Sequence, residues 1–280
     1  MPTKLEDVHL SFIGCGVMAE SMIAGLLHEK LVAARKIVGS HPRESRREEL
    51  EEKYRIRMFG SNAEAADSVR DAENSAVVLC VKPQRVGRVL QDLKGSVAND
   101  GLVVSIVAGA TMETMSRELG TDRIVRAMPN TPSQIGAGIT AWTCTENVDD
   151  KERARVKHLL AALGKELYVE TENMIDMATA LSATGPTYIF MVMEALTDAG
   201  VHLGFSRDLA KELVQETMLG SVKFAMESHK HPAELRNMVT SPGGTSAEAI
   251  YQMEKGTLRT VLSKAVYAAY KRAVELGRRN

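Results

Sequence analysis

The residues best suited to chemistry in this chain form a short glycine-containing turn near its start. Gly14 and Gly16 stand two residues apart, and Ala19 follows three residues later. An apolar run, 8–13, precedes the turn, and a helical pattern with an apolar stripe follows it. A strand that turns through such a loop into a helix brings bare backbone N–H groups toward a pyrophosphate. The pattern predicts a dinucleotide-binding turn, in which Gly14 permits the bend, Gly16 leaves room for the phosphates and Ala19 allows close packing.

A second polar cluster follows the expected second strand, 36–40. At this place NAD-binding folds carry an acidic residue that contacts the ribose hydroxyls. Here the strand runs into His41 and Arg43, with no carboxylate at its tip. A guanidinium group would bind a 2′-phosphate through paired, charge-assisted hydrogen bonds, so the sequence favours NADPH over NADH. The alternative is a solvated helix start in which nearby glutamates pair with the arginines.

The loop 240–248 is the other segment with chemical potential. Gly243 and Gly244 are followed by two hydroxyl residues, Thr245 and Ser246. A helix that begins beside them would offer free N–H groups to a small carboxylate. The alternative is purely structural, because Thr245 and Glu248 match a capping box that would begin the helix. We weigh ligand binding slightly above the cap alone, since a cap does not explain the paired glycines.

These segments need a scaffold that brings the loops carrying them to one edge of a sheet. Up to about residue 170, short Val/Ile/Leu-rich runs alternate with helical segments, which predicts a parallel sheet covered by helices on both faces. After that point the strand signal disappears and helical spacing continues to the end. We therefore expect an α/β protein: a Rossmann-type doubly wound sheet, 1–170, followed by an all-α domain, 171–280. Apolar residues on several faces of 188–193 indicate a homodimer through the helical half, although a self-contained bundle is an alternative.

Composition excludes several classes of function. The 280 residues carry a net charge of −1, which gives no long-range field for nucleic acid or anionic lipid. No apolar run approaches the ~20 residues of a membrane span and no basic-then-apolar leader precedes residue 8, so we expect a cytoplasmic protein. The three cysteines have neither disulfide nor zinc spacing, and no metal site is predicted.

The helical half lacks one familiar catalytic pattern. Hydroxy-acid dehydrogenases of this layout carry a lysine with an asparagine four residues later, and no lysine after residue 170 has that partner. Reduction of an imine differs from that of a ketone, because it can begin from an already protonated acceptor. Such a reaction needs orientation and charge complementarity more than a strong acid.

Taken together, the motifs resemble those of the pyrroline-5-carboxylate reductase family. The resemblance covers nearly the whole chain, and its segments stand in family order and spacing: 12–19, 81–83, 128–132, 181–182 with 185–186, and 240–245. It implies NAD(P)H-dependent reduction of 1-pyrroline-5-carboxylate to L-proline, in proline biosynthesis. It also implies a small-molecule substrate and an intertwined homodimer through the C-terminal helices, which can assemble into a larger ring of dimers.

The resemblance also implies roles for individual residues. The cofactor would be lined by Ile13, Gly14, Cys15, Gly16, Val17, Met18, His41, Arg43, Asn62, Val81, Lys82, Pro83 and Ala108. The substrate would be faced by Glu172, Gly244, Thr245 and Ser246, with residues from two subunits completing one site. The Ser246 hydroxyl, the predicted catalytic group, would hydrogen-bond the ring nitrogen while backbone N–H groups of the loop hold the carboxylate.

Some positions depart from the family pattern. Ser246 stands where a threonine is usual, which keeps the hydroxyl but loses the methyl group that fixes its rotamer. Ala183, Thr184 and Thr187 replace the usual residues around 185–186. These changes leave two alternatives open: a reductase of another cyclic imino acid, such as a six-membered ring, or a catalytically idle NADP-binding module.

Overall fold

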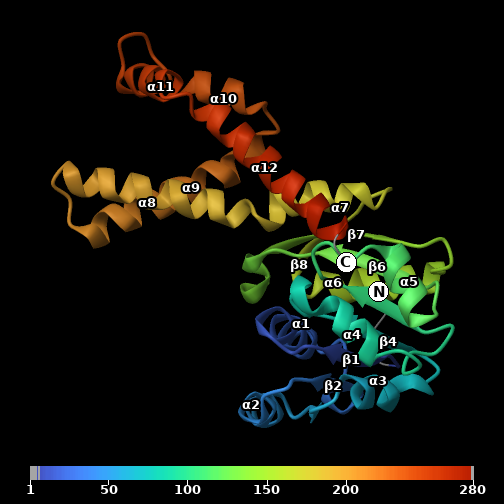
Figure 1. Ribbon diagram of the computed structural model, residues 1–280. Coiled ribbons are helices and arrows are strands. Elements are labelled where there is room, and N and C mark those ends of the chain that lie inside the picture. Colours follow the sequence, from blue (N-terminus) through green and yellow to red (C-terminus); the bar gives the residue numbers. More distant parts are fainter. Residues whose placement is uncertain (1–4, 6, 279–280) are drawn as a thin grey trace. The chain divides into compact units, whose positions relative to one another are not determined.

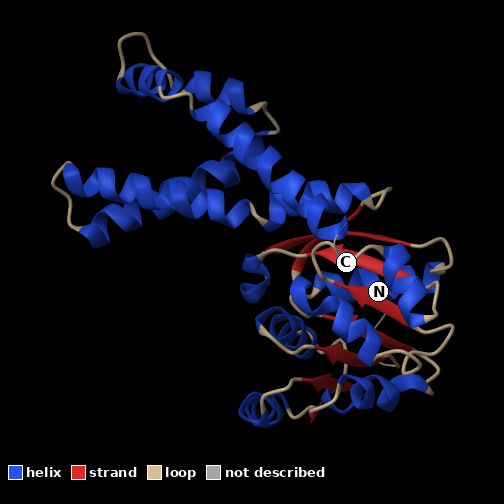
Figure 2. Ribbon diagram, in the orientation of Figure 1, coloured by secondary structure: helices blue, strands red, loops and turns tan. Residues whose placement is uncertain are grey.

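The computed structural model describes residue 5 and residues 7–278, and its strands form one eight-stranded sheet (Figures 1 and 2). The strands are β1 (His9–Ile13), β2 (Ile37–Ser40), β3 (Arg57–Phe59), β4 (Ser75–Leu79), β5 (Leu102–Ser105), β6 (Ile124–Met128), β7 (Gly138–Cys144) and β8 (Gly164–Tyr168). Their order is β3-β2-β1-β4-β5-β6-β7-β8. The order reverses between β1 and β4, and open α/β sheets bind their ligands at such a switch point.

Helices cover both faces of this sheet. They are α1 (Val17–His28), α2 (Glu44–Tyr54), α3 (Asn62–Arg70), α4 (Val86–Asp92), α5 (Met112–Leu119) and α6 (Asp150–Ala161). Residues of α1, α2 and α6 share one buried apolar cluster with alternate strand residues such as Phe12 and Val104. Residues of α3, α4 and α5 share a second cluster with the intervening strand residues, such as Ile13 and Val103. Burial on both faces explains the continuous apolar runs of the sequence, and the predicted α/β class is confirmed.

The last two strands differ from the expected parallel sheet. β1 to β6 are parallel, but β7 runs antiparallel to β6, and β8 is parallel to β7. The link from β6 to β7 holds a single 3₁₀ turn, Thr131–Ile135. A parallel connection needs a crossover of a dozen or more residues, so this short link forces the chain to reverse.

After the sheet, α7 (Asn173–Ala178) runs into a π-helical turn, Thr179–Ala183, and then into α8 (Gly185–His202). The N–H of Thr184 donates to the carbonyl of Thr179, five residues earlier. The small residues around position 183 therefore lie in a π turn that joins the two helices, not in a loop. Such turns inside helices are frequent at functional sites.

The remaining helices are α9 (Arg207–Ser228), α10 (Pro232–Met238), α11 (Thr245–Lys255) and α12 (Leu258–Arg278). By its internal contacts the chain forms two compact units. One contains the described residues up to Thr184 and from Ala269 onward, and the other is Gly185–Ala268. The division predicted from the sequence, 1–170 and 171–280, marks the point where the strand signal ends, and it stays a prediction. Within the described residues, no helix is both long enough and apolar enough to cross a membrane.

Candidate active site

Four predicted cofactor segments meet at one edge of the sheet because their strands are parallel and in register. Ile13 pairs with Ser40 of β2 and with Leu79 of β4, and Leu79 pairs with Ser105 of β5. The loops that leave these four strand ends therefore start side by side at the carboxyl edge. They carry residues 14–18, 41–43, 81–83 and 108 of the predicted set.

The turn after β1 has the backbone that a phosphate loop requires. Gly14 has a φ of +85°, and a Cβ atom there would collide with the side chain of Val81. Gly16 is the N-cap of α1 and has no side-chain cap, and a Cβ on it would meet no heavy atom within 4 Å. The turn thus offers an uncapped helix start with open space in front of it, which suits a pyrophosphate.

The residues next to these glycines have different environments. Val17 is 58% exposed at the helix start, and Met18 is half-buried. Cys15 is fully buried and its thiol lies 3.4 Å from the carbonyl oxygen of Phe12. Burial raises the pKa of the Cys15 thiol to about 12. A thiol in that state is inert, so Cys15 fills space beneath the loop.

Asn62 connects the second and first strand ends through Ser40. The Ser40 hydroxyl donates to the Asn62 side-chain oxygen at 2.8 Å and accepts from the Gly14 N–H at 3.3 Å. The Asn62 amide group donates in turn to Asp92 at 3.2 Å. Asn62 is thereby held against the glycine turn, and its contact with the cofactor stays a prediction.

Three arginines follow β2, and the structure separates their roles. Arg46 pairs with Glu20 and Glu49, and Arg47 donates to the carbonyl oxygens of residues 41 and 42. Arg43 is exposed, and its guanidinium has no partner among the residues that the structure describes. The alternative of glutamates pairing with the arginines thus holds for Arg46 and leaves Arg43 free for a ligand.

His41 lies at the same turn. Its ring Nδ1 accepts a hydrogen bond from the Arg43 N–H at 3.2 Å. Burial is the largest cause that lowers the pKa of the ring; the hydrogen bond from the Arg43 N–H raises the pKa, and the charges of Arg43, Arg46 and Arg47 lower it further. His41 is therefore neutral at neutral pH and fixes the backbone that carries Arg43.

The loops after β4 and β5 complete this edge. Val81 touches Gly14, as above, and Lys82 is the exposed N-cap residue of the short 3₁₀ turn Pro83–Arg85. Ala108 is half-buried against a small apolar cluster that includes Ile175 of α7. The predicted cofactor residues of this unit thus line the ends of neighbouring strands.

Glu172, which the sequence predicts to face the substrate, also forms contacts inside the protein that the sequence did not predict. Its Oε1 atom accepts hydrogen bonds from the Met112 N–H at 2.8 Å and from Arg126 at 3.0 Å. Arg126, on β6, is 1% exposed and also pairs with Asp176 at 2.6 Å. Sequence reasoning missed Arg126 and Asp176 as site residues, although a charged residue inside the apolar run 124–128 was a signal.

The loop 240–246 gives a clear answer on capping. The N-cap of α11 is Gly244, and neither Thr245 nor Glu248 forms the expected capping box. Glu248 instead accepts a hydrogen bond from Gln252. The capping interpretation is therefore wrong, because Thr245 is already the first helical residue. The N–H groups of Thr245 and Ser246 have no partner within the described part of the chain.

No group of three or more metal-binding side chains occurs among the described residues. The comparisons with known proteins cover nearly the whole chain. The family model for pyrroline-5-carboxylate reductase dimerisation matches residues 172–276, and that for NADP oxidoreductase, coenzyme F420-dependent, matches residues 9–109. The pyrroline-5-carboxylate reductase of Synechocystis sp. is 39% identical over 98% of this chain and 100% of its own length. This chain belongs to the pyrroline-5-carboxylate reductase family.

Further relatives agree with this membership. The pyrroline-5-carboxylate reductase of Pseudomonas aeruginosa is 38% identical over 97% of this chain and 98% of its own. The solved structure of the Plasmodium falciparum pyrroline carboxylate reductase, which has NADP bound, superimposes with a TM-score of 0.87 at 29% identity. It covers 97% of this chain and 99% of that one. The pyrroline-5-carboxylate reductase resemblance and the predicted fold class are both confirmed.

Proposed function

We propose that this chain is a pyrroline-5-carboxylate reductase, an oxidoreductase that reduces the C=N bond of 1-pyrroline-5-carboxylate with a reduced nicotinamide dinucleotide. The observation that carries the proposal is the match to curated reductases of that name along 98% of the chain. The uncapped start of α1 at the switch point of the sheet supplies the matching cofactor site.

The chain's residues fit such a dinucleotide. The N–H groups at the start of α1 face open space and would bind the pyrophosphate. Val81, Lys82 and Pro83, from the neighbouring strand end, would line the path toward the nicotinamide. When bound, the reduced nicotinamide supplies a hydride to the imine carbon.

The substrate has two recognition features, a ring nitrogen and a carboxylate. We infer that the free N–H groups of Thr245 and Ser246 bind the carboxylate, because an uncapped helix start favours an anion. The Ser246 hydroxyl would hydrogen-bond the ring nitrogen and orient the C=N bond. A Cβ on Gly244 would collide with the Ser241 side chain, so the tight loop before α11 requires a glycine, and Glu172 would face the ring.

The preferred cofactor is NADPH, and Arg43 supports this preference. It is the arginine of the β2 turn without a partner in the described structure, and no carboxylate competes for the ribose. A guanidinium binds a phosphate through a planar pair of charge-assisted bonds. NADH would lack that contact.

We also propose that the chain acts as a homodimer built from its helical part. Helices α8 and α9 pack on each other, yet they expose large apolar side chains, such as Phe190 (58%), Met191 (65%) and Met226 (69%). Apolar surface of this kind is typical of an interface between subunits. Sedimentation of the wild-type chain and of Phe190→Glu tests the dimer; a monomeric wild-type chain would refute it. A larger ring of dimers is tested by the same measurement at higher concentration.

The free thiols of Cys15, Cys80 and Cys144 support a cytoplasmic location.

The decisive assay follows the near-ultraviolet absorbance of the reduced cofactor. Wild-type protein is mixed with 1-pyrroline-5-carboxylate and either NADPH or NADH, and in parallel with the six-membered analogue, 1-piperideine-6-carboxylate. We expect rapid oxidation of NADPH with the five-membered ring. Turnover of the six-membered ring alone would show that the substrate is another cyclic imino acid. Ala183, Thr184 and Thr187 raised this alternative. No turnover with either ring would leave an idle NADP-binding module.

A further inference from the structure

Arg126 is a buried cation at the edge of the sheet where the cofactor residues meet. It lies on β6, directly beside Ser105 of β5, and only 1% of its side chain is exposed. Its Nη1 atom is 3.0 Å from Glu172 and its Nη2 atom is 2.6 Å from Asp176. A charge removed from water in this way is tolerated only when it is paired and hydrogen-bonded. The two carboxylates supply that pairing.

The contacts of Glu172 are one-sided. Its Oε1 atom takes both the Arg126 guanidinium and the N–H of Met112 at the start of α5. Its Oε2 atom has no partner among the described residues, and 27% of the side chain is exposed. Oε1 is thus fixed by hydrogen bonds within the protein, while Oε2 is available, within the described structure, to a group outside the chain.

We propose that Arg126 is a positioning residue, which fixes Glu172 so that its free Oε2 atom faces the cationic ring nitrogen of the substrate. This inference rests on the proposed function. The protonated imine carries a positive charge next to the carbon that is reduced, and a carboxylate stabilises that charge.

The shape of the arginine side chain matters for this role. A guanidinium is a planar fork and can hold two carboxylates at fixed positions, whereas an ammonium group is a point charge on a flexible stem. Arg126→Lys therefore keeps the positive charge but loosens Glu172 or Asp176. Asp176→Asn is a milder variant, which weakens the second arm without changing the volume of the core.

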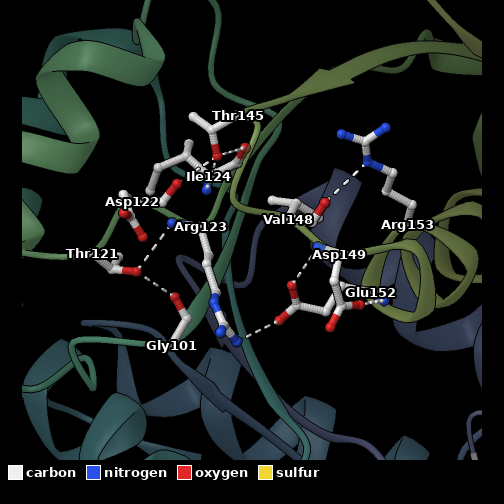
Figure 3. A network of polar contacts seen from close by, with 10 residues as sticks. All are labelled: Gly101, Thr121, Asp122, Arg123, Ile124, Thr145, Val148, Asp149, Glu152 and Arg153. Carbon is white, nitrogen blue, oxygen red and sulfur yellow. Dashed lines mark hydrogen bonds and ion pairs between the residues drawn. The ribbon is translucent and has the colours of Figure 1, made fainter.

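The chain provides a matched control at the opposite end of the same strand (Figure 3). Arg123 pairs with Glu152 at 3.2 Å, and Glu152 is 7% exposed and caps α6. Figure 3 shows this pair among the polar contacts around Thr121 and Asp149. The pair lies at the amino end of β6, whereas Glu172 and Asp176 are bound by Arg126 farther along the strand. Arg123→Lys thus perturbs an arginine–carboxylate pair away from the proposed site, at an arginine whose side chain is 36% exposed rather than 1%.

The experiment measures KM for 1-pyrroline-5-carboxylate and for NADPH, and the affinity for L-proline in the presence of NADP⁺, in wild type and variants. We expect Arg126→Lys to raise the substrate KM about 10–100-fold and Asp176→Asn to raise it several-fold, the size of a charge-assisted contact. The KM for NADPH should change less than about twofold, and Arg123→Lys should leave both constants within about twofold.

A double-mutant cycle separates positioning from structural support. If Arg126 acts through Glu172, then Arg126→Lys should change the substrate KM by less than about twofold in the Glu172→Gln background. A fold-change equal in both backgrounds overturns the proposal. An active wild-type enzyme whose Arg126→Lys and Asp176→Asn variants keep the wild-type substrate KM and L-proline affinity overturns it as well. That result would leave the reductase function standing, because the function fails only through the wild-type assay.

Discussion

Gly14 and Val81 lie against each other at the carboxyl ends of β1 and β4, so closely that any side chain on Gly14 would collide with Val81. Gly14 also has a φ of +85°, which L side chains rarely adopt. Gly16, two residues later, has a φ of −82° and open space where a Cβ would lie. The first glycine is thus required by the protein's own fold, whereas packing does not require the second, for which we propose a phosphate-binding role.

This difference predicts opposite behaviour for two alanine variants. Gly14→Ala should destabilise the protein by about 1–3 kcal/mol, through backbone strain and the collision with Val81. Gly16→Ala should keep the wild-type Tm, because its methyl group meets no protein atom, yet weaken NADPH binding at least about tenfold. Thermal unfolding and cofactor titration check both variants. Wild-type NADPH affinity in a folded Gly16→Ala protein would remove the phosphate-binding role of the turn.

Arg43 gives a prediction on cofactor choice. Arg43→Ala should raise KM for NADPH about 10–100-fold, because it removes charge-assisted bonds to the 2′-phosphate. KM for NADH should change little, since NADH has no such phosphate. Arg47→Ala is the contrasting variant. The Arg47 guanidinium donates to the carbonyl oxygens of residues 41 and 42, so its loss should lower Tm and change the preference for NADPH over NADH less than Arg43→Ala does. Equal effects of Arg43→Ala on the two cofactors would refute the preference.

Ser246 can be changed in two informative directions. Ser246→Ala removes the hydroxyl proposed to hold the ring nitrogen and should lower kcat/KM about 10–100-fold. Ser246→Thr restores the methyl group usual in the family and should raise kcat/KM several-fold by restricting the rotamer. Steady-state kinetics with 1-pyrroline-5-carboxylate measure both. An alanine variant that reacts at the wild-type rate would exclude Ser246 from the mechanism.

Glu20 makes stability depend on acid pH. Burial raises the pKa of its carboxyl group, but hydrogen bonds from Lys53, Arg46 and Tyr54 outweigh burial and lower the pKa to about 2. A carboxyl group with a lowered folded-state pKa stabilises the protein above its unfolded pKa, and this contribution is lost as pH falls toward the folded value.

We therefore expect Glu20→Gln to have a lower Tm than wild type at pH 7. The difference should stay constant down to about pH 5 and shrink steadily toward about pH 2. Thermal unfolding of both proteins across this range provides the measurement, and the comparison cancels the other carboxyl groups. A Tm difference that does not change with pH would show that the ion cluster contributes through packing alone.

Much of the fold could be predicted because its signals are local. The apolar runs that became β1, β4 and β5 are buried on both faces, and a local sequence reports such burial directly. The glycine turn was equally readable, because strand, turn and helix follow one another within about twelve residues. By contrast, the capping box at Thr245 was a wrong prediction: the helix starts one residue earlier, and a pattern alone does not fix that boundary.

The sequence by itself determined the α/β order, the glycine turn after β1 and the family, since each rests on residues close together in the chain or on motifs in a fixed order. The tertiary structure decided which charged residues, far apart along the chain, pair with one another. It paired Arg46 with Glu20 and gave the Arg43 guanidinium no partner among the described residues. It also brought Arg126 to Glu172, 46 residues later. Such contacts depend on which strands lie side by side, and no local pattern encodes the partner of a buried charge.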